Sequence, residues 1–222
     1  MTLALAAGSL VAPNIQGPAN EWVIANTVRW LPIIHQLHLD YPDLDPAWVL
    51  AVIAQESMGE NDVVGGDRVG SVGLMQIAPF DWRPSADRLK NPYINIQWGM
   101  GILDTLQKRH SGDLRLSLAT YNCGEHNLAL GHCGRHGGYA YADVVMDLWT
   151  PAFRFELQAI ANNKHPRADW MNNYYPGASV YEWLASIGYL EGFGDWEVVP
   201  EIKRILCNIV LSARRFRPRI CI

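Results

Sequence analysis

Residues 45–57 have the sequence DPAWVLAVIAQES, and this stretch says most about the fold. Asp45 before Pro46 predicts the start of a helix, because Asp accepts hydrogen bonds from the free amide groups of a first turn and proline already has a helical φ. Apolar residues then recur at the spacing of one helical face. We therefore expect a helix from about Pro46 to Ser57. Its apolar face carries Val49, Val52 and Ile53.

Glu56 lies on the apolar face of this expected helix, three residues after Ile53 and four after Val52. A carboxyl group buried against apolar side chains has a raised pKa, because burial disfavours its charged form. A carboxyl that keeps its proton near neutral pH can act as the general acid that cleaves a glycosidic bond. Glutamates at helix ends are more often solvated or paired with arginine, so Glu56 alone does not establish catalysis.

The rest of the chain predicts further helices separated by turns. A periodic stretch at 20–38 is interrupted by Pro32, which predicts a kink or two shorter helices. Residues 58–72 are rich in Gly, Asp and Asn, so we expect a turn or short hairpin there. Asn91-Pro92 and Asp113 predict two more helix starts. The first of these helices should have a face made of Ile94, Trp98, Ile102 and Leu106, and the second is followed by a Gly- and His-rich loop at 124–138 and a last helix at 139–149.

The composition indicates a globular protein without a strongly basic surface. The chain has 222 residues, of which 49% are hydrophobic and 18% charged, and this is enough for one sizeable core. The formal net charge is −4 and basic residues are sparse before 214–219, which argues against nucleic acid as a partner. No apolar run approaches the ~20 residues that span a bilayer, so we expect no stable membrane insertion. Since no Lys or Arg precedes Arg29, residues 2–12 lack the positive start of an export signal.

The cysteines leave two alternatives open for the loop after residue 122. Cys123 and Cys133 are close enough in sequence to form a disulfide in an oxidising compartment. Together with nearby histidines they also have a spacing that structural zinc sites use. A disulfide or plain surface histidines fit at least as well as zinc, so we expect no metal and no cofactor. The histidines concerned are His126, His132 and His136.

Four short blocks follow one another along the chain. They are Ala54–Ser57 (AQES), Gly73–Pro79 (GLMQIAP), Asn95-Ile96 with Gly99, and Ala119–Gly124 (ATYNCG). Each block alone is weak, but their order and separation resemble the four sequence blocks of soluble lytic transglycosylase domains, which share the lysozyme-like fold with goose-type lysozymes. The resemblance covers about residues 30–150. It implies a mainly α, lysozyme-like fold with a small β-hairpin or loop beside the cleft, plus a helical C-terminal extension.

The resemblance also implies roles for residues inside the blocks. Glu56 falls where the family has its only essential acid and base. Ser57 is implied to contact substrate or to hold the wall of the active site, and Gly73 to form a tight passage beside the cleft. The remaining substrate-binding positions are Gln76 as a hydrogen-bonding residue of the groove, Tyr121 with its hydroxyl near the catalytic carboxyl, and Asn122 as a residue that fixes the cleft.

Two positions depart from the family pattern and bear on the reaction. Ala78 stands where the transglycosylases often have Met and goose-type lysozymes have an acidic residue. Asp67 matches one of two acidic residues that help to hold the hydrolytic water in the goose type, so it is present without its companion. A water-activating pair would favour hydrolysis. A lone Glu56 favours an intramolecular route to a 1,6-anhydro end, with a goose-type hydrolase as the alternative and a non-catalytic wall-binding protein as a more distant one.

The predicted enzyme is therefore a peptidoglycan lytic transglycosylase that needs no cofactor. It should bind strands of alternating N-acetylmuramic acid and N-acetylglucosamine, act outside the cytoplasm and be a monomer that binds no nucleic acid. We expect three parts of the chain, with a possible boundary at Pro151. These are an N-terminal segment at 1–19 that is a candidate for disorder, the lysozyme-like domain at 20–150 and a C-terminal helical extension of unknown role at 151–222.

Overall fold

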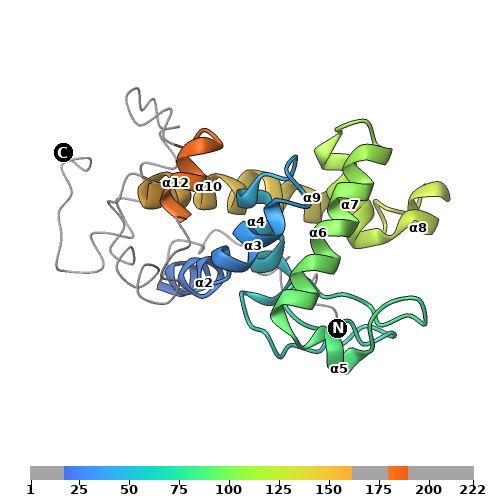
Figure 1. The fold of residues 1–222 in the computed structure, drawn as a ribbon. Helices are drawn as coiled ribbons and strands as arrows, with labels where there is room; N and C mark the ends of the chain where they lie inside the picture. The colour runs from blue at the N-terminus through green and yellow to red at the C-terminus, as the bar shows by residue number, and fades with distance from the viewer. Residues whose placement is uncertain (1–17, 162–179, 190–222) are drawn as a thin grey trace.

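The computed structural model describes residues 18–161 and 180–189, and this part of the chain is mainly helical (Figure 1). The mainly α fold expected from the sequence is confirmed. The helices are α2 (Pro18–Val28), α3 (Leu31–His38), α4 (Pro46–Ser57), α5 (Ala86–Leu89), α6 (Pro92–Arg109), α7 (Leu114–Cys123), α8 (Glu125–Ala129), α9 (Gly138–Asp143), the π-helix η1 (Val144–Trp149), α10 (Thr150–Ala161) and α12 (Val180–Ser186).

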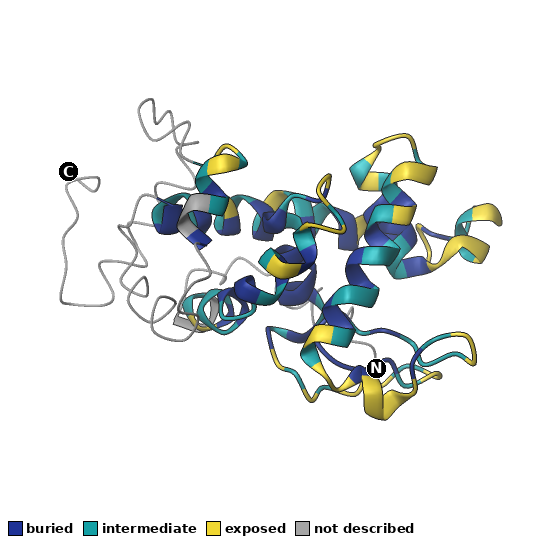
Figure 2. Ribbon diagram, in the orientation of Figure 1, coloured by how far each residue is buried: buried dark blue, intermediate teal, exposed yellow. Residues whose placement is uncertain are grey.

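Helix α4 is the centre of the molecule. It begins as predicted, with the Asp45 side chain accepting a hydrogen bond from the backbone N–H of Ala47 at 2.9 Å and Pro46 in the first turn. The expectation of a single apolar face was too narrow, because α2, α3, η1 and α10 all pack against α4 and bury it on nearly every side. Figure 2 shows this burial in the middle of the fold, with exposed residues gathered around α5 and α8. Glu56 is thus a carboxyl group on a core helix.

Helices α2 and α3 hold the C-terminal end of α4. Their break falls at Arg29 and Trp30, just before Pro32, which sits in the first turn of α3 and so starts a helix instead of kinking one. The indole N–H of Trp30 donates to the Gly59 carbonyl at 2.9 Å, and Arg29 donates to the same oxygen at 3.1 Å. Gly59 has φ +79°, and a side chain there would collide with the backbone of Asn26 at 2.7 Å. The chain therefore leaves α4 in a fixed direction.

The segment between α4 and α6, residues 58–91, forms a lobe of loops with the short helix α5, at the bottom of the view in Figure 1. Its only β structure within the described residues is two isolated antiparallel bridges, Val64 with Val72 and Val72 with Ile77. Asn95, fully buried on α6, holds the lobe through its side-chain amide. Its Oδ1 accepts from the N–H of Met75 at 2.8 Å, and its Nδ2 donates to the carbonyls of Val72 at 2.8 Å and Leu89 at 2.9 Å. The small hairpin or loop expected beside the cleft is present as this lobe.

Helix α6 packs on the core through a different face from the predicted one. Its start is as expected, with Asn91 accepting from the N–H of Ile94. The buried residues are Asn95, Ile96, Gly99, Met100, Leu103 and Leu106. Trp98 and Ile102 are only half-buried. Gly99 decides this orientation, because a side chain there would overlap the sulfur of Met75 at 2.2 Å.

Helix α10 begins at Thr150, directly after η1 ends at Trp149, so helical structure continues across the expected boundary at Pro151. Phe153, Leu157 and Ile160 of α10 are buried in the same core as α4. The division of the chain into three parts stays a prediction, and residues 1–17, 162–179 and 190–222 lie outside the described residues. Among the helices that are described, none is long and apolar enough to cross a membrane.

Candidate active site

Glu56 forms part of the wall of a hollow of about 490 Å³ between α4, the loop lobe and α7. The side chain is half-buried, and its Oε1 accepts a hydrogen bond from the hydroxyl of Tyr141 at 2.7 Å. Burial raises the pKa of Glu56 to about 7, with a smaller rise from the charge of Asp67, while the hydrogen bond from Tyr141 lowers it. At neutral pH this carboxyl group can therefore both give and take a proton, as a general acid and base must.

Tyr141 was not anticipated from the sequence. It is a buried residue of α9, and its hydroxyl reaches Glu56 across 85 positions of the chain. The same burial and the nearby carboxylate raise the pKa of Tyr141 well above its usual value, so it remains a donor. A tyrosine in a short, Gly-flanked stretch gives no local signal of this role, since the two meet only through the tertiary fold, in which α9 packs against α7 and η1, and η1 packs against α4.

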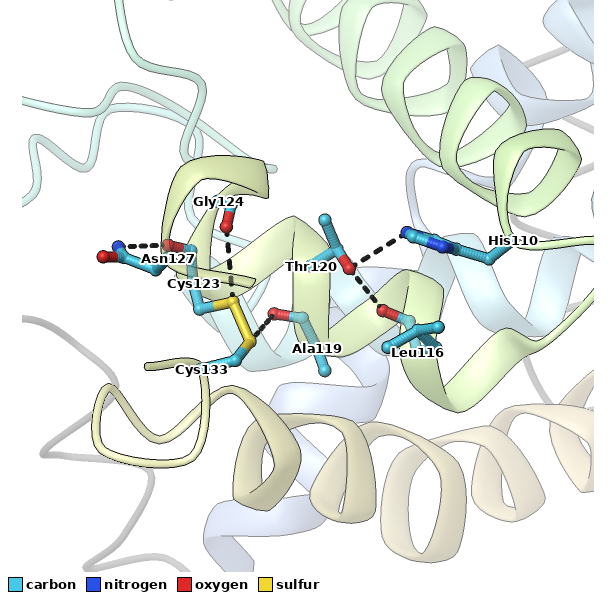
Figure 3. The surroundings of a disulfide bond; sticks show 8 residues. All are labelled: His110, Leu116, Ala119, Thr120, Cys123, Gly124, Asn127 and Cys133. Carbon is cyan, nitrogen blue, oxygen red and sulfur yellow. Dashed lines mark hydrogen bonds between the residues drawn. A yellow bond between two sulfur atoms is a disulfide. The ribbon is translucent and has the colours of Figure 1, made fainter. Parts of the chain in front are cut away.

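A disulfide fixes the start of α9 (Figure 3). Cys123 at the end of α7 is bonded to Cys133, and their Cα atoms are 5.4 Å apart. Gly138, the first residue of α9, lies against this bridge, and a Cβ there would stand 2.6 Å from the sulfur of Cys133 and 2.8 Å from the carbonyl oxygen of Ala119. The bridge and the glycine together set the position from which Tyr141 reaches Glu56.

The disulfide also decides between the two alternatives for this loop. Because Cys123 and Cys133 are bonded to each other, neither is a free thiolate that could bind zinc. Within the described part of the chain, no three His, Cys, Asp or Glu side chains come together as metal ligands would.

Tyr121 lies beside Glu56 but does not hydrogen-bond to it. It lines the same hollow, and its hydroxyl donates to the carbonyl of Met75 at 2.8 Å. Burial and then the charge of Glu56 raise its pKa well above the usual value, which places it within electrostatic reach of the carboxyl group. The hydrogen bond from Tyr121 to Met75 therefore joins α7 to the loop lobe.

Ser57 and Gly73 are buried in the wall and do not line the hollow. The Ser57 hydroxyl donates to the carbonyls of Ile53 at 3.1 Å and Leu74 at 2.9 Å, so it joins the end of α4 to the lobe. Gly73 has φ +79°, and a side chain there would meet Asn95 Nδ2 at 2.4 Å. The close approach at Gly73 is to Asn95 rather than to an open cleft. Of the two roles expected for Ser57, this geometry favours holding the wall.

Gln76 and Asn122 do line the hollow with Glu56. Gln76 has φ +47°, a left-handed backbone that is uncommon for a residue with a side chain. Its Nε2 donates to the carbonyls of Gly73 at 2.9 Å and Val63 at 3.2 Å, which leaves its Oε1 as the acceptor next to Gly65. The strained backbone is therefore held by two hydrogen bonds inside the lobe.

Asp67 lines the hollow as well, and its environment is opposite to that of Glu56. Burial acts to raise its pKa, but hydrogen bonds from the Ser71 hydroxyl and from backbone N–H groups, including those of Ser71 and Val69, outweigh it and lower the pKa. Its Oδ1 accepts from the N–H of Val69 at 3.1 Å and of Ser71 at 3.0 Å, and its Oδ2 accepts from the Ser71 hydroxyl. The hollow thus holds Glu56, whose pKa is raised to about 7, and Asp67, whose pKa is lowered and which stays ionised. Ala78 also lines it and adds no second ionised group.

Comparison with known proteins places this arrangement in a family. Residues 37–130 match the family model described as the transglycosylase SLT domain. This range contains Glu56, Gln76 and Tyr121, but it ends before Tyr141. A search among curated proteins found no significant match to the chain. The match supports lytic transglycosylase-type activity on peptidoglycan. Residues 37–130 are therefore similar to the transglycosylase SLT domain family, within the lysozyme-like superfamily.

Proposed function

We propose that the protein is a lytic transglycosylase that cleaves the β-1,4 bond between N-acetylmuramic acid and N-acetylglucosamine, with Glu56 as general acid and then general base. The observation that carries the proposal is the pKa of Glu56, raised by burial to about 7, inside a hollow of about 490 Å³. A group with a pKa near the working pH is suited to both halves of such a reaction.

In the first half, protonated Glu56 gives its proton to the glycosidic oxygen as the bond to the muramyl C1 breaks. In the second half, the carboxylate takes the proton of the muramyl 6-hydroxyl while that oxygen bonds to C1. The products are a free 4-hydroxyl on one fragment and a 1,6-anhydromuramyl end on the other, and no water is consumed. Glu56 finishes protonated, so it is ready for the next turnover. Tyr141, 2.7 Å from Oε1, stabilises the carboxylate between the two steps.

A goose-type hydrolase is the second candidate, because Asp67 shares the hollow with Glu56 and stays ionised. Two observations weigh against it. The carboxylate of Asp67 already accepts from two backbone N–H groups and one hydroxyl inside its own loop. Ala78 contributes no acidic partner for a water-holding pair. Most of the capacity of Asp67 for hydrogen bonds is therefore used to shape the loop.

Mass analysis of a peptidoglycan digest tests this proposal. We expect anhydromuramyl products from the unchanged protein and none from Glu56→Gln, which should reduce turnover by about 10³-fold or more while glycan binding persists. A digest with only reducing muramyl ends would assign the protein to the hydrolases. Full activity of Glu56→Gln would remove Glu56 from the reaction, and binding with no turnover in the unchanged protein would support the non-catalytic alternative.

We also propose that the protein acts outside the cytoplasm. Peptidoglycan lies outside the cytoplasmic membrane, and a disulfide between Cys123 and Cys133 is typical of an oxidising compartment.

A further inference from the structure

A second, larger hollow of about 1060 Å³ adjoins the one that contains Glu56. The two share a boundary, where the same side chains line both. These are Phe80, Arg83, Ile102, Tyr121 and Gly124. The two hollows are therefore neighbours, and a long substrate bound at Glu56 would reach the second hollow at these side chains.

The walls of the second hollow are suited to a sugar polymer. Trp98, Ile102 and Leu106 of α6 line it, and they belong to the apolar face that was expected from their spacing. On the lobe side, Trp82 is 73% exposed and its ring stacks on that of Phe80, with centroids 5.0 Å apart. An exposed aromatic ring that is already held by a neighbour offers a flat apolar surface at little cost in side-chain entropy.

Arg83 is placed at the boundary of the two hollows without a carboxylate partner. It is half-buried, and burial lowers the pKa of its guanidinium group. Its Nη1 donates to the carbonyl of Ala78 at 3.3 Å, and its guanidinium carbon lies 5.2 Å from the ring centre of Phe80. Among the described residues it forms no ion pair, whereas Arg109, on the wall of the second hollow, is paired with Glu125.

A guanidinium group that is partly removed from water and has no counter-ion favours a bound anion. Its flat fork of N–H donors matches a carboxylate in particular, which it can bind through two parallel hydrogen bonds. A cation–π contact with the ring of Phe80 helps to hold the guanidinium group at this boundary. The unsatisfied charge of Arg83 therefore faces the space through which the substrate would pass.

We propose that Arg83 binds a carboxylate carried by the side group of a muramyl sugar, and so makes the enzyme selective for muramyl glycans over neutral amino-sugar polymers. This rests on the proposed function, and it specifies the substrate at the same site. The carboxylate has two sources. In a naked strand it ends the lactyl ether on the sugar, and in a substituted strand it belongs to the stem peptide attached there. Neutral chitin chains carry neither.

Binding to the inactive Glu56→Gln protein separates this inference from the proposed reaction, because no cleavage is needed. Calorimetric titration would compare three oligomers of equal sugar number: a peptide-bearing muramyl glycan, the same glycan freed of its peptides by an amidase, and a chitin oligomer. Adding Arg83→Gln should weaken binding of one or both muramyl ligands by about 10-fold or more, as expected for a charge-assisted hydrogen bond. Binding of the chitin oligomer should change by less than about 2-fold, which also shows that the variant is folded.

The pattern of loss distinguishes the two sources. A loss confined to the peptide-bearing glycan assigns the carboxylate to the stem peptide, and a loss confined to the naked glycan assigns it to the lactyl group. Arg83→Lys should recover part of the affinity, since it keeps the charge but lacks the fork. Arg88→Gln, an exposed arginine of α5, is the control for removal of one positive charge. Equal losses on all three ligands, or no loss on any, would overturn the inference. If muramyl glycans bind in a way that depends on Arg83 but the unchanged protein does not cleave them, only the proposed reaction is refuted.

Discussion

The pKa of Glu56 is set by three neighbouring influences that differ in sign. Burial is the largest and raises the pKa, the charge of Asp67 raises it further, and the hydrogen bond from Tyr141 lowers it. Because the net result is about 7, small changes in any of these influences alter how much of the enzyme is in the acid form at neutral pH.

Tyr141→Phe should move the alkaline limb of the pH profile of kcat/KM to higher pH. The hydroxyl stabilises the charged form of Glu56, so its loss raises the pKa of Glu56 further. A hydrogen bond to a charged group contributes about 1.5–3 kcal/mol, so we expect a shift of the order of one pH unit. Tyr139→Phe changes an exposed tyrosine of the same helix and should leave the limb in place. If the alkaline limb of kcat/KM stays at the same pH in Tyr141→Phe, a group other than Glu56 is responsible for that limb.

Glu56→Gln should stabilise the fold at pH 8 and have little effect at pH 4. The folded state holds the proton up to a pKa of about 7, whereas the unfolded chain loses it near 4.5. Between these values the folded protein binds more protons, so the unfolding free energy of the unchanged protein falls as pH rises. The glutamine amide of Glu56→Gln does not titrate, so the variant does not lose stability in this way. We expect its free energy of unfolding at pH 8 to exceed that of the unchanged protein by about 1–3 kcal/mol.

Urea unfolding at the two pH values would measure this difference. Glu60→Gln, an exposed glutamate four positions on, is the matched control. A gain that is the same at pH 4 and pH 8 would show that the stability change does not come from the proton on Glu56.

At the scale of the element, α9 depends on a bridge that lies outside it. The disulfide between Cys123 and Cys133 closes the loop that leads into α9, and Gly138 allows the helix to start against it. The five residues from Gly137 to Tyr141 span a single helical turn, with the Tyr141 N–H bonded to the Gly137 carbonyl at 2.8 Å. Movement of this turn would displace the tyrosine that holds Glu56.

The double change Cys123→Ser and Cys133→Ser should lower the unfolding free energy by about 2–4 kcal/mol, because the unfolded chain regains the freedom of the loop. It should also shift the alkaline limb of kcat/KM in the same direction as Tyr141→Phe. Reductant should bring the unchanged protein to the behaviour of the double variant and leave the variant itself unaffected. Equal unfolding free energies for the oxidised protein and the variant would show that the bridge adds no stability.

At the scale of the whole molecule, the cleft lies where a rigid helix core meets a lobe with little regular structure. Helix α4 is packed by α2, α3, η1 and α10, which keeps Glu56 in place although its burial costs free energy. The lobe has no extended strands among its described residues and depends on single side chains for its position. Asn95, Ser57 and Tyr121 each join it to a helix through backbone carbonyls or an N–H group.

The helix starts and the position of Glu56 on an apolar helix face could be predicted from the sequence. Asp45, Asn91 and Asp113 begin their helices as predicted, because capping joins a side chain to an amide only two or three positions away. Glu56 was found for a related reason, since the spacing of apolar residues along one helix is visible in the sequence. The order of the blocks then indicated the family that the match to residues 37–130 confirms.

Only the tertiary structure decided which residues meet Glu56 and what the apolar faces do. Tyr141 lies 85 positions from Glu56, and no local pattern encodes a contact over that distance. The face of α6 with Trp98 and Ile102 matched a core helix in spacing, but both side chains are only half-buried, and they pack against the core while also lining the second hollow. The spacing of apolar residues along a helix indicates only that one face of the helix is apolar. Whether that face meets protein or substrate depends on how all the helices pack together, and this is fixed by shape across the whole core.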